Sequence, residues 1–364
     1  MSEPLSLQLV GSKALGGAER WFLRFAAALG TCGARAELGI RRGSELDGLA
    51  GNLTHLPLHR LPFLSVWDPW SRLAVSRLIR RIRPDLVQTY MGRATRLTHL
   101  SPDAKGGRGP IHVARLGGYY KLDPYLHAHA WIGNTRGLCD WMVRQGLPAG
   151  RVFHIYNFAD PAHPVAAPQV AVLRAALALP KDAWVLLAPG RFVPVKGHAD
   201  LLDALAILPR EIGGRPLRLI LLGDGPLRPE LERQAARLGI ADRLVWPGWQ
   251  TDPGPYFCLA DQVVFPSLEE ETLGNVILEA WAWGRPLVAS LFRGAREIAR
   301  HGEDAWCVPC RDPRALAAGI RTLIEEPLLA ASMVERGGRR VQAEFGRDAI
   351  VSQYLDLYRT LART

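Results

Sequence analysis

The chain has few cysteines and no apolar run long enough to cross a membrane. Its 364 residues include five cysteines, a small and odd number that argues against a disulfide framework. A spanning helix needs ~20 consecutive apolar residues, and no run approaches that length. The N-terminus, Met-Ser-Glu-Pro-Leu-Ser, lacks the basic start and apolar stretch of a signal peptide. We therefore expect a protein of the cytoplasm.

Sequence patterns for metals, dinucleotides and nucleic acids are also missing. Cys307-Val-Pro-Cys310 has redox or zinc spacing, but no second Cys or His pair follows at metal distance. We interpret these two cysteines as small buried residues and assign no metal and no disulfide. The glycines between Gly11 and Gly17 do not fit G-x-G-x-x-G, which argues against a nicotinamide oxidoreductase. No helix-turn-helix, zinc or single-strand-binding signature points to nucleic acid.

The positive charge is confined to the first half of the sequence. Residues 1–170 carry 21 Lys and Arg against 11 Asp and Glu, whereas residues 171–364 carry 24 of each kind. A codon bias toward arginine would raise the charge in both halves, and the second half is balanced. A one-sided basic lobe predicts an anionic partner, such as lipid headgroups, a phosphorylated saccharide or nucleic acid.

Apolar runs and helical periodicities alternate along the chain. The expected strands are 5–10, 85–90, 111–116, 130–134, 184–188, 217–222, 244–246, 262–265 and 286–289. The expected helices are 18–29, 70–82, 135–145, 197–208, 228–238, 276–283 and 313–325. Strands that alternate with helices of this length imply parallel sheets with helices on both faces, so the predicted fold class is α/β.

A stretch rich in Pro and Ala, residues 161–168, lacks periodicity and predicts a linker between two such runs. We expect a first Rossmann-like lobe over residues 1–165 and a second over residues 170–346. Ligands of open α/β sheets bind outside the carboxyl ends of the strands, so a cleft between the lobes is the expected site.

The most informative stretch is Pro266–Ser290, PSLEEETLGNVILEAWAWGRPLVAS. Glu271 and Glu279 lie on either side of a strand-to-helix turn in which Gly274 permits a sharp bend. Backbone N–H groups over Asn275–Leu278, at the helix N-terminus, can hold a phosphate or a sugar hydroxyl. Glu279, one turn into the helix, is suited to accept hydrogen bonds from a diol.

Two cations follow the expected strand 184–188. Arg191 and Lys196 occupy a glycine-flanked loop that opens a helix, an arrangement suited to clamping a diphosphate. Taken alone, the two cations can equally be solvated surface charges.

Two further turns fall at the carboxyl ends of expected strands. They are Gly223-Asp224-Gly225-Pro226 and Trp246-Pro247-Gly248-Trp249. By position both can line the same cleft, and either can equally be an ordinary turn.

Four motifs occur in order: GGAE (Gly16–Glu19), GRFVPVKG (Gly190–Gly197), LLGDGPLRPEL (Leu221–Leu231), and the PSLEEETLGNVILEAWAWGRPLVA stretch that begins at Pro266. Together they resemble retaining glycosyltransferase family 4, also called glycosyl transferases group 1. The resemblance covers nearly the whole chain and is closest over residues 184–325. Among relatives it is most similar to bacterial enzymes that build lipopolysaccharide or other surface glycans.

The resemblance implies a GT-B fold, two Rossmann-like lobes facing a cleft, with a C-terminal helix over residues 349–361 packing back on the first lobe. It implies that a hexose-type sugar moves, with retention, from a nucleotide-diphosphate donor to a glycan or glycolipid acceptor. It implies no cofactor and no bound metal, and the chain contains no Asp-x-Asp.

The resemblance also assigns roles by motif position. Arg191 and Lys196 would bind the donor diphosphate, and Glu271 would hold the transferred sugar. Glu279 would hold the ribose hydroxyls. The remaining donor-binding residues would be Gly274, Asn275, Val276, Gly223 and Gly248 of the second lobe, with Gly16 and Gly17 of the first.

The sequence departs from the family pattern at two places. One residue more than usual precedes the first glutamate, so Glu270 competes with Glu271 for its role. Many relatives carry a catalytic-site His after the strand that matches residues 111–116, and none stands there in this chain. His112 lies within the strand and is interpreted as a packing residue. The acceptor-side candidates that remain are Arg115, Tyr119, Tyr120 and Lys121.

The helix expected over residues 70–82 is amphipathic and basic. Its apolar stripe comprises Trp70, Leu73, Ala74, Leu78, Ile79 and Ile82, and its other side carries Arg72, Arg77, Arg80, Arg81 and Arg83. We interpret it as a lobe helix whose stripe packs on the sheet. The alternative is peripheral attachment to an anionic membrane at the inner face of the plasma membrane.

One alternative to catalysis shares the fold. A non-catalytic GT-B scaffold, or a protein that only binds nucleotide sugars, would have the same strands and helices. The presence of Arg191, Lys196, Glu271 and Glu279 together argues for the enzyme.

Overall fold

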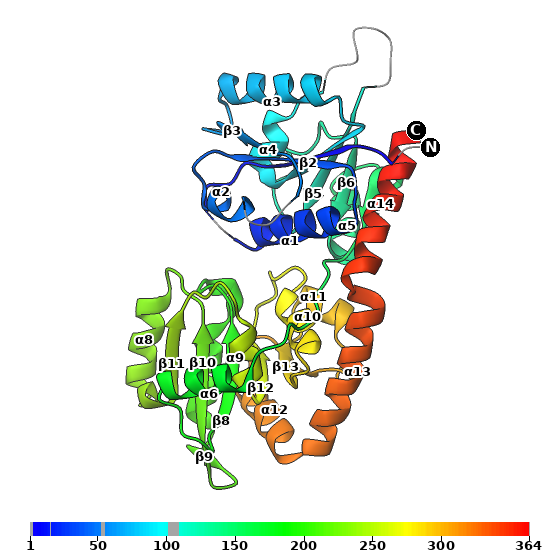
Figure 1. The fold of residues 1–364 in the computed structure, drawn as a ribbon. Coiled ribbons are helices and arrows are strands. Elements are labelled where there is room, and N and C mark those ends of the chain that lie inside the picture. Colours follow the sequence, from blue (N-terminus) through cyan, green and yellow to red (C-terminus); the bar gives the residue numbers. More distant parts are fainter. Residues whose placement is uncertain (1–2, 15, 52–54, 101–108, 364) are drawn as a thin grey trace. The chain divides into compact units, whose positions relative to one another are not determined.

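The computed structural model describes residues 3–14, 16–51, 55–100 and 109–363. The chain divides into two compact units (Figure 1): the first is Met1–Asn157 with Arg347–Thr364, and the second is Phe158–Gly346. The division precedes the stretch expected as a linker, because Phe158 and Ala159 are already buried. The Ala159 N–H donates to the Phe345 carbonyl at 3.0 Å, which fixes these residues to the second unit.

The first unit is built on a parallel sheet with the order β3-β2-β1-β4-β5-β6-β7 among the described residues. The strands are β1 Ser6–Val10, β2 Ala36–Arg41, β3 Leu58–Leu61, β4 Leu86–Tyr90, β5 Ile111–Leu116, β6 Ala130–Gly133 and β7 Val152–His154. The helices are α1 Gly17–Thr31, α2 Glu45–Ala50, α3 Pro69–Ile82, α4 Met91–Leu97, α5 Arg136–Arg144 and α14 Arg347–Arg363, with the 3₁₀ turn η1 Ala149–Arg151.

The C-terminal helix α14 belongs to the first unit through aromatic packing and buried polar contacts. The ring centres of Phe25 on α1 and Tyr354 on α14 lie 4.4 Å apart. Gln8 and Gln88 are fully buried in β1 and β4, and a buried amide is costly unless it is hydrogen-bonded. The Tyr358 hydroxyl accepts from Gln8 Nε2 at 3.2 Å and donates to Gln88 Oε1 at 2.9 Å.

Helix α3 packs its apolar stripe into the core of the first unit. Val75, Leu78 and Ile79 are buried in a cluster that includes Leu7, Leu9 and Val87 of β1 and β4, and Ala74 and Ile82 pack against it. The interpretation of α3 as a lobe helix is therefore confirmed. Trp70 is an exception to the predicted stripe, because it lies at the start of the helix and is 71% exposed.

The second unit repeats the same winding. Its strands follow the order β11-β10-β8-β12-β13-β14, with β9 antiparallel to β10. The strands are β8 Trp184–Pro189, β9 Glu211–Ile212, β10 Arg215–Leu222, β11 Leu244–Gly248, β12 Gln262–Phe265, β13 Leu287–Ser290 and β14 Trp306–Val308. The helices are α6 Ala167–Ala176, α7 His198–Ile207, α8 Arg228–Arg237, α9 Gly254–Leu259, α10 Asn275–Ala282, α11 Arg293–Ile298, α12 Pro313–Glu325 and α13 Pro327–Phe345, with 3₁₀ turns η2 Pro194–Lys196 and η3 Ala241–Arg243.

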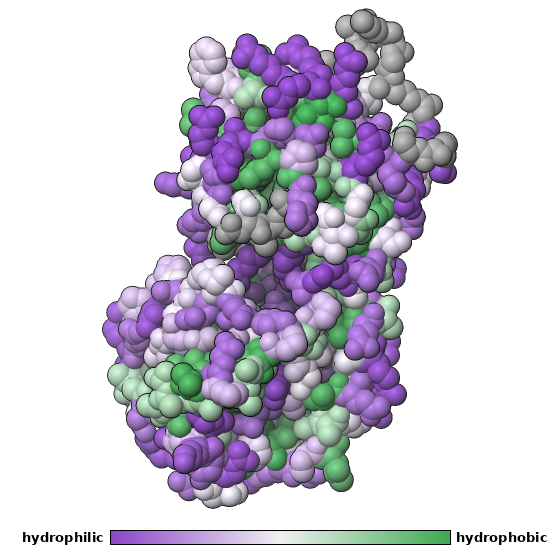
Figure 2. Space-filling model, in the orientation of Figure 1, coloured by the Kyte–Doolittle hydropathy of each residue, from purple (hydrophilic) through white to green (hydrophobic). Residues whose placement is uncertain are grey.

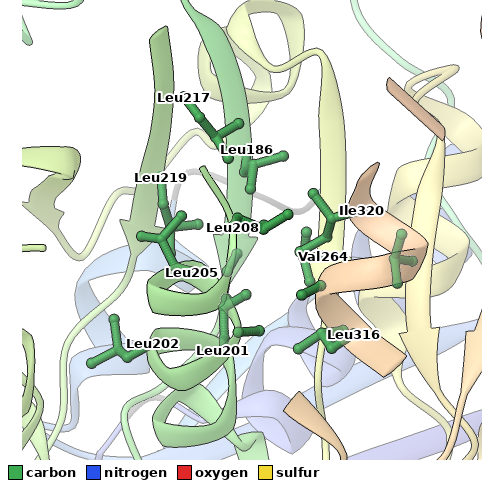
Figure 3. Packing of buried hydrophobic residues seen from close by; sticks show 14 of the residues in the cluster. Leu186, Leu201, Leu202, Leu205, Leu208, Leu217, Leu219, Val264, Leu316 and Ile320 are labelled. Atoms are coloured by element: carbon green, nitrogen blue, oxygen red, sulfur yellow. The ribbon is translucent and has the colours of Figure 1, made fainter. Parts of the chain in front are cut away.

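The core of the second unit lies between its sheet and helices α7 and α12 (Figure 3). Leu201 and Leu205 of α7 and Ile320 of α12 are fully buried in the same cluster as Leu186 of β8 and Val264 of β12. Each such side chain stabilises the fold by about 1.5–3 kcal/mol relative to an exposed one. Because this packing holds β8 and β12 side by side, it fixes the loops that leave their carboxyl ends.

Candidate functional site

The loops after β8 and β12 flank the point where the chain reverses its direction of winding in the second unit. From β8 the sheet extends through β10 to β11 on one side, and β12 then pairs with the other side of β8 and leads to β13 and β14. In open parallel sheets, the crevice beyond the carboxyl ends of two such strands is where ligands bind. The candidate site therefore comprises the segments that follow Pro189 and Phe265.

A close backbone contact joins these two loops. Gly197 follows η2 with φ of 63°, and a Cβ atom there would lie 2.0 Å from the Pro266 carbonyl oxygen. Only glycine accommodates both that conformation and that approach. The Leu268 N–H donates to the Val195 carbonyl at 2.8 Å, which adds a direct bond between the loops. The contact sets Lys196 beside the acidic stretch that begins at Glu269.

Lys196 and Glu271 form an ion pair at this junction. Lys196 Nζ lies 2.8 Å from Glu271 Oε2, and the two side chains are 21% and 15% exposed. The Ser267 hydroxyl donates to the same oxygen at 3.5 Å. The Lys196 ammonium also lies 5.0 Å from the centre of the Phe265 ring, within cation–π range. A pair this shielded from solvent is screened less by salt than a surface pair.

Glu271 differs from the two acids that precede it. Glu269 is bound by Arg296, whose hydrogen bond lowers the pKa of that carboxyl, and it also lies 3.6 Å from Arg293. Glu270 is exposed. Among the three consecutive glutamates, Glu271 is the one in contact with Lys196, which favours the register proposed from the sequence.

Helix α10 begins immediately after this acidic stretch. Gly274 adopts φ of 76°, and a Cβ atom there would lie 2.5 Å from the Phe292 ring, so the turn depends on glycine. Asn275 and Val276 begin α10, and the N-terminus of a helix is where backbone N–H groups can donate to a ligand. The helix macrodipole adds partial positive charge at this end, which favours an anion.

Glu279 and Arg191 are near these segments in sequence but lack contacts with the ion pair. Glu279 is one turn into α10 and partly exposed, and its carboxylate has no hydrogen bond or ion pair among the described residues. Arg191 is exposed on the loop after β8, likewise without a partner in the described part of the chain. The structure therefore joins Lys196 to Glu271 and leaves the other two charged groups open to solvent.

Gly223 and Gly248 close the carboxyl ends of β10 and β11. A Cβ atom on Gly223 would lie 2.1 Å from the Gly190 carbonyl oxygen, so this turn packs directly on the loop after β8. Gly248 pairs in register with Leu222, and open space surrounds its missing Cβ. Gly223 thus supports the Arg191 loop, whereas Gly248 lies at the edge of the sheet.

His198 was not among the site residues predicted from the sequence. It opens α7 and is 3% exposed, and its ring Nδ1 has no hydrogen-bond partner. Burial lowers the pKa of His198 to about 3, and the positive charge of Lys196 acts in the same direction. A neutral imidazole therefore lies directly behind the Lys196–Gly197 turn. Its position after a Lys-Gly pair was the only sequence signal.

In the first unit, Gly16 and Gly17 open α1, which follows β1. The Gly16 N–H donates to Glu19 Oε2 at 2.9 Å, and Glu19 is buried. The helix N-terminus thus already holds one carboxylate. Gly17 is exposed, and a Cβ atom there would meet nothing within 4 Å. Of the two glycines, Gly17 is the more open to a ligand.

Arg115 is not an accessible acceptor-side residue, contrary to one of the candidates from the sequence. It is 3% exposed, and its guanidinium donates to the Tyr354 hydroxyl at 3.0 Å and to Asn157 Oδ1. It also lies 4.7 Å from the centre of the Trp21 ring. Because β5 points this cation inward, it ties β5 to α1 and α14.

His112 is a packing residue, as expected. It is 1% exposed, and its Nε2 lies 2.9 Å from Thr89 Oγ1. Burial, with the neighbouring His127, lowers the pKa of His112 to about 3. Of the other acceptor-side candidates, Tyr119 packs edge-on against Trp141 and Lys121 is exposed.

Comparison with known proteins identifies the family. The model of the family described as "Glycosyl transferases group 1" matches residues 183–326, which contain every second-unit site residue named above. The lipopolysaccharide core biosynthesis glycosyltransferase LpsE of Rhizobium meliloti is 33% identical over 94% of this chain and 95% of its own length. The chain belongs to the glycosyl transferases group 1 family. LpsD of the same organism is similar to this glycosyltransferase to the same extent, 33% identical over 94% of the chain.

Solved structures identify the fold of this glycosyltransferase as GT-B. HepE of Anabaena, crystallised with UDP and glucose, superposes with a TM-score of 0.82 over 97% of this chain and 99% of that chain, at 23% identity. WaaG, a glycosyltransferase involved in lipopolysaccharide biosynthesis, superposes with a TM-score of 0.68 over 97% of this chain, at 16% identity. Two Rossmann-like domains, each wound from a central reversal point, are thus common to these proteins.

The cysteines of the glycosyltransferase are all free thiols. Burial raises the pKa of Cys307 to about 12, and Cys310 Sγ donates to the Ser267 carbonyl at 3.6 Å. Within the described ranges no group of His, Cys, Asp and Glu side chains has the arrangement of a metal site. None of the helices described is both long and apolar enough to cross a bilayer.

Proposed function

We propose that this glycosyltransferase is a retaining enzyme that moves a hexose-type sugar from a nucleotide-diphosphate donor to a glycan or glycolipid acceptor in lipopolysaccharide core synthesis. The observation that carries the proposal is the shielded Lys196–Glu271 pair, set between the ends of β8 and β12 and followed by the N-terminus of α10. The cation and the backbone N–H groups at the N-terminus of α10 are suited to bind the phosphates of a sugar diphosphate. The acid is suited to bind its sugar hydroxyls.

In the bound complex, each of these groups would contact a different part of the donor. Lys196 and Arg191 donate to the diphosphate oxygens, and the first N–H groups of α10 hold the phosphate next to the sugar. Once Lys196 turns to the phosphate, the Glu271 carboxylate is released to accept hydrogen bonds from the sugar hydroxyls. Glu279, whose carboxylate is open to solvent, accepts from the two ribose hydroxyls.

The transfer step breaks the bond between the anomeric carbon and the diphosphate oxygen and forms a bond from that carbon to the acceptor oxygen on the same face. The acceptor proton passes to the departing diphosphate, which leaves as the nucleoside diphosphate. Lys196 and Arg191 stabilise the negative charge that develops on the leaving oxygens, the role that a metal ion has in other transferases. We therefore propose a metal-independent reaction that needs no cofactor.

The relatives support the donor and pathway classes. HepE has been crystallised with UDP-glucose, and the names of LpsE and LpsD place those enzymes in lipopolysaccharide core biosynthesis. The basic first unit suits an anionic acceptor, so we further propose that the protein works in the cytoplasm at the inner face of the plasma membrane.

A donor panel tests the proposal. The full chain is heated with UDP-glucose, UDP-galactose, GDP-mannose or ADP-glucose in the presence of EDTA, and the unfolding temperature is recorded. One donor should raise it in proportion to the logarithm of its concentration, because the ligand binds only the folded state. The same donor should then be hydrolysed slowly without acceptor. Binding without hydrolysis or transfer would indicate the non-catalytic scaffold, and dependence on Mg²⁺ would contradict the metal-free mechanism.

A further inference from the structure

Three large apolar side chains are exposed close together at the start of α3. Leu64 is 59% exposed, Trp67 is 78% exposed and Trp70 is 71% exposed. Single apolar residues are common on protein surfaces, but a group of this size marks an interaction site. We call these three residues the tryptophan patch. The favoured interpretation of the sequence assigned Trp70 to the buried stripe, with membrane attachment of this helix as the alternative, and neither predicted that Leu64 is exposed beside the two tryptophans.

The local fold holds the patch outward. The Asp68 carboxylate caps α3 by accepting from the Trp70 and Ser71 N–H groups at 3.2 and 3.0 Å, and Pro69 fixes the first helical residue. The buried Ser71 hydroxyl accepts from the Leu64 N–H at 3.1 Å. These bonds define the backbone from Leu64 to Ser71, so the exposed side chains project from a fixed turn.

Positive charge surrounds the patch. The Arg96 guanidinium lies 4.5 Å from the centre of the Trp67 ring. At 3.6 residues per turn, Arg77 and Arg81 lie on the same side of α3 as Trp70. The exposed cations of this segment are Arg72, Arg77, Arg80, Arg81 and Arg83, against the single acid Asp68. Hydrophilic side chains gather over α3 in Figure 2.

We propose that the tryptophan patch inserts into the interface of an anionic bilayer while the arginines of α3 bind the lipid headgroups. Tryptophan favours the headgroup level of a membrane, because its ring is apolar and its N–H is polar. Anionic lipids attract clustered arginines at the same depth. A nucleic acid would pair with the arginines but would leave Leu64 without an apolar contact, so the bilayer accounts for both features.

This inference rests on the proposed function only in that a glycolipid acceptor lies at such a surface. Neither the patch nor α3 contains a residue that is assigned to donor binding. Membrane binding can therefore be measured without donor, acceptor or turnover. A chain that binds vesicles but transfers no sugar would contradict the proposed function and leave this inference supported.

The test is sedimentation of the full chain with vesicles of phosphatidylcholine alone or mixed with phosphatidylglycerol. The wild type should bind the anionic vesicles at low salt and dissociate as NaCl is raised. Trp67→Ser with Trp70→Ser should weaken binding by about tenfold for each ring removed from the interface. The matched control is Leu328→Ser in the second unit, a side chain that is 86% exposed, and it should bind as the wild type does.

Charge is tested separately with Arg77→Gln and Arg80→Gln, two exposed arginines of α3. This variant should lose binding to anionic vesicles and leave the weak binding to neutral vesicles unchanged. Thermal unfolding and donor hydrolysis should match the wild type in both patch and charge variants, which establishes that they fold. Absence of wild-type binding at low salt, or equal binding by the tryptophan variant, would overturn the inference.

Discussion

The two units have the same sheet topology but different residues at the point where the chain reverses its direction across the sheet. In both sheets the first strand is central, two parallel strands extend from it to one side and the later strands lie on the other side. The second unit places Lys196 and Glu271 at that point, with 21 Lys and Arg against 23 Asp and Glu overall. The first unit places there Gly17 and Gly16, whose N–H donates to the buried Glu19, and it has 24 basic against 12 acidic residues.

This difference distinguishes the unit that resembles the rest of the family from the unit whose surface is particular to this chain. The family model matches only residues of the second unit, where we propose that the donor binds. The first unit carries the surplus positive charge, the tryptophan patch and a core closed by Arg115. The same winding thus carries different side chains in the two units, and function depends on those side chains rather than on the fold.

The largest expected effect is loss of turnover on Lys196→Ala. Removal of this cation leaves the departing charge unstabilised, so kcat should fall about 10²–10³-fold while the donor KM changes little. The measurement is steady-state kinetics with the donor found by thermal shift. Lys181→Ala, an exposed lysine of the same unit, is the control and should be active. A fully active Lys196→Ala enzyme would break the comparison, because the second unit would no longer hold the reacting charge.

The next effect is on stability and concerns the contact between the β8 and β12 loops. Gly197→Ala must accommodate both a left-handed backbone and a Cβ atom 2.0 Å from the Pro266 carbonyl oxygen. We expect a loss of about 3 kcal/mol in the free energy of unfolding by urea. Gly248→Ala has a similar φ of 77° but open space, so it should cost only about 1 kcal/mol. Equal losses would mean that the loop contact is unimportant.

Glu279→Ala tests whether this residue of the second unit binds the ribose of the donor. Loss of two hydrogen bonds from the ribose should raise the donor KM about 10–10²-fold, with kcat changed much less. Glu270→Ala removes an exposed acid of the same charge and should leave both constants near the wild-type values. If Glu270→Ala were instead the damaging change, the register of the acidic stretch would have to shift by one residue.

The sequence predicted much of the architecture but little of what depends on close packing. Alternating periodicity located β5, β12 and α12, and the motifs located the ion pair. Helix α13 was missed because Gly337 and Gly338 in its middle disfavour a helix. In the structure a Cβ atom on Gly337 would lie 2.4 Å from the Trp281 ring, so the glycine permits α13 to pack on α10. Tertiary contacts thus override a local preference.

The sequence also did not predict which of several side chains are buried and which are exposed. Arg115 follows a strand pattern that is compatible with an inward or an outward side chain, and only the position of α14 decides that it is inward. Trp70 fits the helical stripe, but it is the second residue of α3 after the Asp68 cap, and its side chain is exposed. His198 became notable only when its unpartnered nitrogen was found behind Lys196. Each of these depends on a partner distant in the chain.

The smallest predicted effect is the pH dependence of stability that comes from one buried histidine in each unit. Burial lowers the pKa of His112 in the first unit and of His198 in the second from 6.5 to about 3. Both imidazoles stay neutral in the folded state while the unfolded chain takes up protons below pH 6.5. Stability is therefore complete above that pH and is lost progressively as the pH falls toward 3.

Each histidine should lower the free energy of unfolding by about 1.4 kcal/mol when the pH falls from 7.5 to 5.5. Urea unfolding of His112→Gln and His198→Gln at the two pH values tests this, since glutamine cannot titrate. Each variant should lose less stability on acidification than the wild type, by that amount. Because His198 lies next to Lys196 in the chain, its variant alone should also lower kcat, with the shape of the pH–rate profile unchanged since the imidazole is neutral above its pKa of about 3. Wild-type kcat in both variants would mean that the histidine next to Lys196 has only a packing role, like its counterpart in the first unit.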